Sequence, residues 1–221
     1  MKHRVGTKTA APQPGRAALR AARLVLALLA ASTVAYDVAT SAGDADFSAA
    51  DYFSYFTIES NLAAAAVLLA GALRDPRSAA WGSVRGAVTL CLAITGIVYA
   101  VLLSDRADGS DPAWISAVLH QVMPVALLLD WLADPPRRRV SYRAALVWLA
   151  IPAAYCAYSL IRGAIVGWYP YFFIDVTEPG GYGRVAVNSL ALALGFAVLA
   201  MVVTGLGNAA ARLRGPSGGG P

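Results

Sequence analysis

Long apolar runs separated by short polar segments form the dominant pattern of this chain. A run of about 20 apolar residues, coiled as an α-helix, crosses the roughly 30 Å hydrocarbon core of a bilayer. Six runs come close to this length, at residues 21–36, 53–73, 84–103, 114–132, 144–161 and 185–206. The pattern therefore predicts an all-α, polytopic membrane protein with six transmembrane helices.

The composition supports the same class and predicts one membrane domain. Hydrophobic residues make up 58% of the chain and charged residues 14%, and the mean hydropathy is +0.57, which lies outside the balance of a soluble protein. We expect one six-helix domain over residues 16–210, between disordered segments at 1–15 and 211–221. The first apolar run has no small-residue cleavage site before Asp37, so we expect a retained anchor rather than a signal peptide.

The basic residues alternate along the predicted topology. With an even number of spans, one side of the membrane receives most of them: Lys2, Arg4, Lys8, Arg16, Arg20, Arg23, Arg74, Arg77, Arg85, Arg137, Arg138, Arg139, Arg143, Arg212 and Arg214. The other side holds Arg106, Arg162 and Arg184 together with most of the acidic loop residues. The positive-inside rule therefore predicts a multi-pass protein of the cell membrane with both termini cytoplasmic. The net charge of +5 is then a topology signal and implies no nucleic-acid partner.

Common cofactor and hydrolase motifs are absent from the sequence. It contains no P-loop, GxGxxG or GxSxG pattern and no internal repeat, so phosphate, dinucleotide and standard serine-hydrolase functions have no support. The two cysteines, Cys91 and Cys156, lie inside predicted spans without metal-ligand spacing, and we interpret them as small packing residues. No metal or organic cofactor is implied.

His120 lies inside an otherwise apolar run, and this position makes it the first candidate for a functional residue. An ionisable group at membrane depth is costly to bury and commonly serves a function. Pro124 follows four residues later, and because proline has no N–H, the carbonyl of His120 loses its helical partner. We expect the helix to bend there and expose polar backbone beside the imidazole.

The second predicted span begins with a polar stripe at similar depth. Thr57, Ser60 and Asn61 share one helical face through their i+3 and i+4 spacing, while Glu59 points away. Thr57 lies about 7 Å from the start of its span and His120 about 9 Å from the start of its own, at 1.5 Å per residue, and both spans run inward from the outer surface. The matching depths would allow a threonine–histidine pair if the two helices are neighbours.

Further polar and aromatic groups fall in the same outer layer. Asn188, Tyr155, Tyr158, Ser159 and Arg162 approach the outer ends of the fifth and sixth spans. The loop between these spans is rich in aromatic residues, among them Trp168, Tyr169, Tyr171, Phe172 and Phe173 around Pro170. This loop is typical of an interfacial aromatic belt, and the alternative is an amphipathic lid that admits a lipid tail. At the other side, we expect Asp130 to end its span and reach interfacial water.

Three short segments resemble those of a known family. These are YFT with Thr57, LHQVMP with His120, and WYPYFFID followed by PGGYGR. They resemble the androgen-induced membrane proteins and the bacterial predicted six-pass membrane proteins of the same superfamily. The resemblance extends over the order and spacing of all six spans. It implies a threonine hydrolase of fatty-acid esters of hydroxy fatty acids, with the catalytic pair at Thr57 and His120.

In chemical terms, the resemblance implies nucleophilic acyl transfer from a lipid ester, with membrane lipid as the surrounding partner. A threonine hydroxyl needs a base within hydrogen-bond reach, and neutral imidazole suits this role near neutral pH. We expect Thr57 to attack the ester carbonyl while His120 takes its proton. Candidate contacts for the oxyanion and the substrate are Asn61, Asn188, Arg162, Trp168 and Tyr169, and Asp51 or Asp175 could orient His120.

Two other functions remain open at this stage. A small proton-linked transporter would use His120 as a proton relay with Glu59 or Asp130 as its partner, and a non-catalytic scaffold or sensor would need no chemistry. Thr57 could simply bond its own i−4 carbonyl, and Asn61 could hold helices together. Substrate turnover in detergent separates the first two functions, because a hydrolase needs no gradient.

Overall fold

The computed structural model describes residues 14–106 and 112–214, and within these ranges it contains helices and no strand. The helices are α1 (Pro14–Ser41), α2 (Ala49–Tyr52), α3 (Phe56–Leu73), α4 (Ala79–Val98), α5 (Ala113–Ala117), α6 (Met123–Ala133), α7 (Tyr142–Val147), α8 (Ala150–Val166) and α9 (Gly181–Leu213). Two π-helical turns, Tyr99–Leu103 and Val118–Val122, extend α4 and join α5 to α6. Short 3-10 turns lie at Ser104–Arg106 and Phe172–Ile174.

Six stretches of these helices are long and apolar enough to cross a membrane in the described part of the chain. They are Gly15–Ser41, Phe56–Leu73, Ala79–Leu103, Ala113–Ala133, Tyr142–Val166 and Gly181–Leu213. The prediction of an all-α, six-pass membrane protein is confirmed. α9 continues to Leu213, into the predicted C-terminal disordered segment, while residues 1–13 and 215–221 of the two predicted disordered segments lie outside the described residues.

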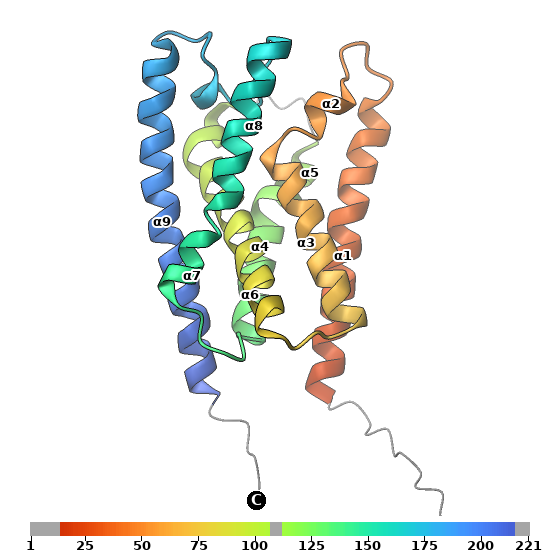
Figure 1. Ribbon diagram of the computed structural model, residues 1–221. Coiled ribbons are helices and arrows are strands. Elements are labelled where there is room, and N and C mark those ends of the chain that lie inside the picture. The colour runs from red at the N-terminus through yellow and green to blue at the C-terminus, as the bar shows by residue number, and fades with distance from the viewer. Residues whose placement is uncertain (1–13, 107–111, 215–221) are drawn as a thin grey trace, which may run out of the picture.

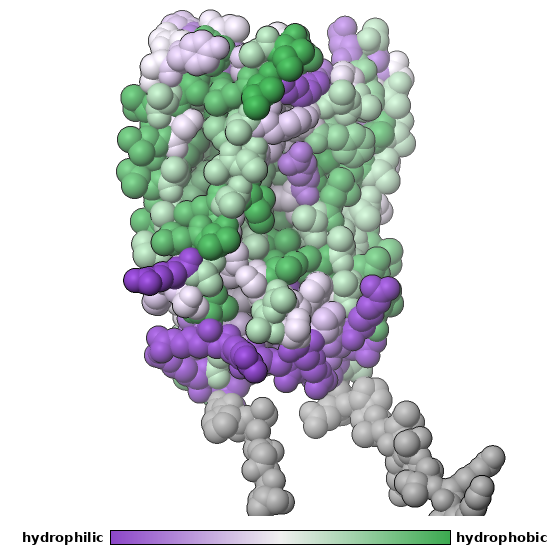
Figure 2. All heavy atoms as spheres, in the orientation of Figure 1, coloured by the Kyte–Doolittle hydropathy of each residue, from purple (hydrophilic) through white to green (hydrophobic). Residues whose placement is uncertain are grey.

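The spans form an upright bundle in which the first and last helices lie at opposite edges (Figure 1). α1 packs along α3, α4 occupies the centre against α3, α6 and α9, and α7 packs on α9. α1 starts and α9 ends at the same end of the bundle, and this end is hydrophilic (Figures 1 and 2). It is here named the basic end, because the first part of α1 carries Arg16, Arg20 and Arg23 and the last turn of α9 carries Arg212. The opposite end carries α2 and the loop of residues 167–180. An apolar belt lies between the two ends (Figure 2).

Close packing around small residues holds the central helices together. A side chain added at Gly207 would come within 2.3 Å of the Trp131 indole, and one added at Gly86 would come within 2.3 Å of the Trp148 ring. Trp131 is fully buried and its indole N–H donates to the carbonyl of Val203 at 2.9 Å. Lipid tails are as apolar as the core, so such close contacts and buried hydrogen bonds hold membrane helices together.

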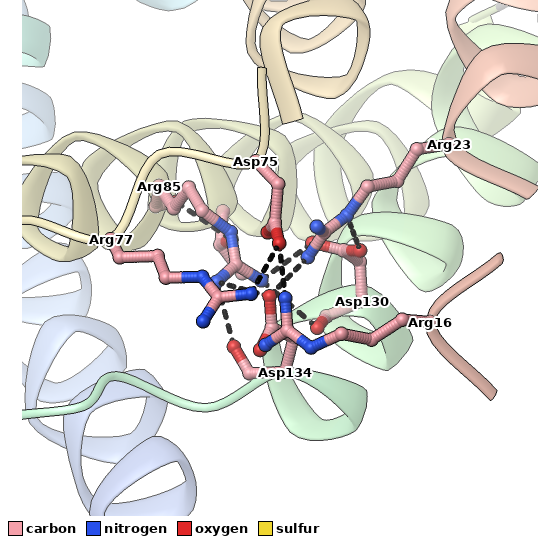
Figure 3. Close-up of polar contacts among 8 residues, drawn as sticks. Arg16, Arg23, Asp75, Arg77, Arg85, Asp130 and Asp134 are labelled. Carbon is pink, nitrogen blue, oxygen red and sulfur yellow. Dashed lines mark hydrogen bonds and ion pairs between the residues drawn. The ribbon is translucent and has the colours of Figure 1, made fainter. Parts of the chain in front are cut away.

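A buried ion-pair cluster joins three helices at the basic end (Figure 3). Asp130 of α6 receives hydrogen bonds from Arg23 of α1 and Arg85 of α4, each at 2.6 Å. Asp130 is only 8% exposed and Arg23 only 2%. The expectation that Asp130 reaches interfacial water is therefore wrong, because the ends of α1 and α4 enclose it and supply arginine partners that remove the need for solvent.

The cluster continues toward the surface through two more acidic residues. Asp134 pairs with Arg23 at 2.8 Å, and Asp75 pairs with Arg77 at 3.1 Å and with Arg16. Burial raises the pKa of Asp134, but the hydrogen bond from Arg23 and the charges of Arg85 and Arg23 outweigh it, so the pKa lies below its usual value. The pKa of Asp75 is lowered as well, because Arg77 and Arg16 outweigh its burial.

Candidate functional site

Thr57 is the second residue of α3, directly after a turn that stops the chain from continuing α2 as one helix. Tyr55 precedes α3 with an extended backbone, and the N–H groups of Ile58 and Glu59 both donate to its carbonyl. Thr57 is buried, as are Ser60 and Asn61, whereas Glu59 is exposed. The predicted polar stripe is therefore confirmed, and it faces the interior of the bundle.

The structure brings Thr57 and His120 together. The Oγ1 atom of Thr57 lies 3.3 Å from Nε2 of His120, so α3 and the α5–α6 segment are neighbours at this depth. The other ring nitrogen, Nδ1, lies 3.1 Å from the carbonyl oxygen of Ser116. A carbonyl only accepts, so Nδ1 carries the proton of the neutral ring and Nε2 presents its lone pair to the threonine hydroxyl.

The imidazole is held on its face as well as at its edge. The rings of Tyr99 and His120 stack with centroids 4.0 Å apart and planes 16° apart. The Ser116 hydroxyl donates to the Tyr99 hydroxyl at 2.9 Å, so the stacked tyrosine is fixed to the same turn that binds Nδ1. Within the described ranges, orientation of His120 therefore comes from Ser116 and Tyr99 and uses no acidic residue.

Both acidic residues predicted to orient His120 bind elsewhere. Asp51 accepts from Arg162 at 2.5 Å, and Asp175 accepts from the backbone N–H and the hydroxyl of Thr177 at 2.8 and 2.7 Å. The expectation that either one orients the imidazole is wrong, because a local carbonyl already supplies the acceptor that Nδ1 needs.

The predicted distortion at Pro124 takes the form of a π-helical turn. Over Val118–Val122 the bonding shifts to i−5, so that the N–H of Met123 donates to the carbonyl of Val118. π-Helical turns inside α-helices are rare and occur frequently at functional sites. The second such turn begins at Tyr99, so each member of the stacked pair lies in a π-helical turn of its own helix.

Asn61 lies beneath the pair but both amide hydrogens are engaged. Its Nδ2 donates to the carbonyl of Thr57 at 2.9 Å and to that of Leu119 at 3.2 Å, while Oδ1 is buried without a hydrogen-bond partner in the structure. Asn61 therefore joins the Thr57 turn directly to the residue before His120. This arrangement fixes the spacing of the two helices.

The remaining predicted contacts lie in or beside the loop of residues 167–180, away from the Thr57–His120 contact. Asn188 donates to the carbonyl of Phe173 at 3.0 Å. The guanidinium of Arg162 lies 5.2 Å from the centre of the Trp168 ring, and the ring of Tyr169 packs on Gly163, where an added Cβ would come within 2.1 Å of it. These contacts hold the loop on the ends of α8 and α9.

The loop turns its apolar residues inward. Phe173 and Ile174 are buried, and together with Tyr171 they line a cavity of about 470 Å³ between α3, α4, α8 and α9. Its walls are almost wholly apolar, and Thr57 and Tyr171 supply polar groups where the walls meet α3. A second, outward groove of about 500 Å³ between α4 and α9 shares Ile94, Val98 and Phe196 with it.

The partners named for a proton-relay function lie apart from the imidazole contacts. Glu59 is exposed on the far face of α3, and Asp130 is engaged by Arg23 and Arg85. No group of three or more His, Cys, Asp or Glu side chains in the described ranges is arranged to hold a metal ion.

Comparison with protein-family models, with curated proteins and with solved structures finds no match to this chain.

Three residues of the site were not identified from the sequence. Ser116 lies four residues before His120, so helical spacing could have found it. Tyr99 and Tyr171 come from a different span and from a loop, and no local pattern distinguishes them from other membrane-interface aromatics.

Proposed function

We propose that this protein is an integral membrane hydrolase that cleaves lipid esters, with Thr57 as the nucleophile and His120 as the general base. The observation that carries the proposal is the 3.3 Å contact between Thr57 Oγ1 and the unprotonated Nε2 of His120, at the wall of an apolar cavity that includes Thr57. A hydroxyl nucleophile with its base in reach, and the base oriented by a third group, is the arrangement that acyl transfer requires.

The reaction proceeds in two steps. Nε2 of His120 takes the hydroxyl proton as Thr57 Oγ1 forms a bond to the ester carbonyl carbon. The bond from that carbon to the alcohol oxygen then breaks, and His120 returns the proton to the departing alkoxide. Nε2 of His120 then takes a proton from water as the water oxygen bonds to the acyl carbon. The bond from that carbon to Thr57 Oγ1 breaks, and the proton returns to Oγ1 as the fatty acid leaves.

The cavity supports one orientation of the ester in this proposal. Thr57 lines the cavity but His120 does not, and the leaving alkoxide must meet His120 to receive its proton. The acyl chain therefore occupies the cavity and the alcohol departs on the imidazole side. Along α8 the cavity lining runs from Leu149 to Leu160, about 17 Å at 1.5 Å per residue, which suits a long acyl chain.

The charge distribution supports a location for the site. Arg16, Arg20 and Arg23 near the start of α1 and Arg212 near the end of α9 lie at the same hydrophilic end of the bundle (Figure 2), and this end is cytoplasmic under the positive-inside rule. Both termini are then cytoplasmic in a cell membrane, and Thr57, near the opposite end, lies at the level of the outer leaflet. An ester group at this depth stays near water while its tails remain in the bilayer.

Hydrolysis of chromogenic and branched fatty-acid esters by the purified protein in detergent tests the proposal. We expect turnover by the wild type and a loss of at least about a hundredfold in Thr57→Val and His120→Ala. Thr33→Val is the matched control, because the buried hydroxyl of Thr33 has no partner in the structure and lies on α1. A fluorophosphonate should label the wild-type peptide that contains Thr57. An inert wild type, or full activity of Thr57→Val, would refute the hydrolase.

A further inference from the structure

Tyr171 contacts the candidate nucleophile from the loop of residues 167–180. The backbone N–H of Thr57 donates to the phenol oxygen of Tyr171 at 3.4 Å. Both residues line the same apolar cavity. Thr57 is the second residue of α3, where helix N–H groups lack partners within the helix and point outward with partial positive charge. The phenol oxygen therefore lies at the positive end of α3, beside the hydroxyl that attacks.

Aromatic packing fixes the Tyr171 ring in this position. The ring stacks on Phe173 with centroids 5.1 Å apart and planes 6° apart, and it meets the edge of Tyr55 at 5.7 Å. Pro170, which is buried, precedes it and restricts the backbone of the loop. A catalytic hydrogen-bond donor must be held in place before the reaction, because reorientation during the reaction would cost free energy.

The phenol keeps its proton at any physiological pH. Desolvation by the surrounding protein raises the pKa of Tyr171 to about 12, although its hydrogen bonding with Thr57 and with the backbone of Phe56 opposes the rise. The phenol is thus an acid that donates and does not serve as a base. Since its oxygen accepts from the Thr57 N–H, the hydroxyl proton is the part of Tyr171 left to bind a substrate.

Acyl transfer at Thr57 creates a need for such a donor. When Oγ1 adds to the ester carbonyl, the carbonyl oxygen becomes negatively charged, and it must be stabilised by donors close to the nucleophile. The amide of Asn61 donates to two backbone carbonyls, and Asn188, which donates to the carbonyl of Phe173, does not line the cavity that holds Thr57. Tyr171 is the neutral donor that the structure places at Thr57 within the cavity wall.

We propose that the Tyr171 hydroxyl donates the hydrogen bond that stabilises the oxyanion formed when Thr57 attacks an ester. Tyr171 is then a third catalytic residue, supplied by the loop and polarised by the N-terminus of α3. This inference rests on the proposed hydrolase function and adds the group that distinguishes the transition state from the bound ester.

Tyr171→Phe tests the inference, because it removes only the hydroxyl and keeps the ring packing. We expect kcat to fall by about 10² with KM nearly unchanged, as for the loss of one oxyanion donor. Binding of a trifluoromethyl ketone, which forms a tetrahedral adduct with a hydroxyl nucleophile, should weaken in parallel, while binding of the product fatty acid should not change. Tyr182→Phe is the control, since Tyr182 is 72% exposed on α9.

The outcomes separate the two proposals. If Tyr171→Phe keeps kcat within about twofold of the wild type while Thr57→Val is inactive, the hydrolase stands and the role of Tyr171 is refuted. A purely structural role would lower the melting temperature and raise KM, with equal loss of ketone and fatty-acid binding, and would also refute it. An inert wild type would refute both.

Discussion

The rings of Tyr99 and His120 stack 4.0 Å apart, and each residue lies in a π-helical turn of its own helix. The two turns shift the helical register at the same depth, so α4 presents a flat ring to the imidazole that α5 and α6 carry. With Ser116 at Nδ1 and Thr57 at Nε2, the imidazole has fixed neighbours at both nitrogens and at one face.

Replacing Tyr99 should separate stacking from hydrogen bonding. Tyr99→Phe keeps the stacked ring and loses only the bond from Ser116, so we expect activity within about threefold of the wild type. Tyr99→Leu removes the stacked pair, worth about 0.5–1.5 kcal/mol, and we expect kcat to fall by up to about tenfold. Steady-state kinetics on one fatty-acid ester measures both. Equal rates for the two variants would show that the stack does not position His120.

Gly96 permits the close approach of α4 to the distorted helix. A Cβ added there would lie 3.0 Å from Pro124 Cβ and 3.2 Å from the His120 carbonyl oxygen. Displacing a backbone carbonyl or a proline ring costs free energy, because both are rigid. We expect Gly96→Ala to lower stability by about 1–3 kcal/mol and to reduce kcat as His120 shifts. Gly195→Ala, with open space around it, should leave both the melting temperature and kcat near wild type; matching values for the two variants would contradict this account.

Acyl-chain length should respond to a bulky residue in the cavity. Ala153 lines the cavity on α8 close to Leu149, at the part farthest toward the basic end, so Ala153→Phe should shorten the space for the chain. We expect kcat/KM for long-chain esters to fall relative to short-chain esters, by about tenfold or more. Ala153 and its neighbour Ala154 are both exposed, but Ala154 does not line the cavity, so Ala154→Phe should keep the wild-type preference. Unchanged chain-length ratios in Ala153→Phe would place the acyl chain elsewhere.

Asp130 neutralises two buried arginines, so its removal should be costly. Asp130→Asn leaves Arg23 and Arg85 without their shared carboxylate, and breaking a buried pair by removal of one partner costs about 3–5 kcal/mol. A melting curve in detergent measures the loss. Asp105→Asn, at an exposed site, should change stability by no more than about 0.5 kcal/mol. A melting temperature of Asp130→Asn equal to that of Asp105→Asn would exclude a stabilising role for the cluster.

The basic-end cluster should also make stability depend on acid pH. The pKa values of Asp134 and Asp75 lie below their usual value of 3.8. A lowered carboxyl pKa contributes stability that is fully present above the unfolded value and is lost as pH falls through the folded value. We expect a constant melting temperature from neutral pH down to about pH 5 and a decline below about pH 4. The melting temperature of Asp134→Asn should decline less steeply with falling pH. A decline as steep as that of the wild type would show that other groups cause the loss of stability in acid.

The contact between Thr57 and His120 shows how much of the site the sequence could predict. Helical periodicity placed Thr57, Ser60 and Asn61 on one face, and rise per residue gave Thr57 and His120 similar depths. These are properties of single helices, so a linear pattern reveals them. Asp130 shows the opposite case, because its burial depends on arginines from α1 and α4 that lie more than 40 residues away in the chain.

The sequence by itself determined the membrane class, the six spans and the depth of the two candidate catalytic residues, because span length, hydropathy and helical spacing are local quantities. The tertiary structure alone decided which side chains meet: Tyr99 on the face of His120, Tyr171 at the N–H of Thr57, and two arginines around Asp130. These contacts depend on helix adjacency and on the path of one loop, which are set by packing among all the helices together.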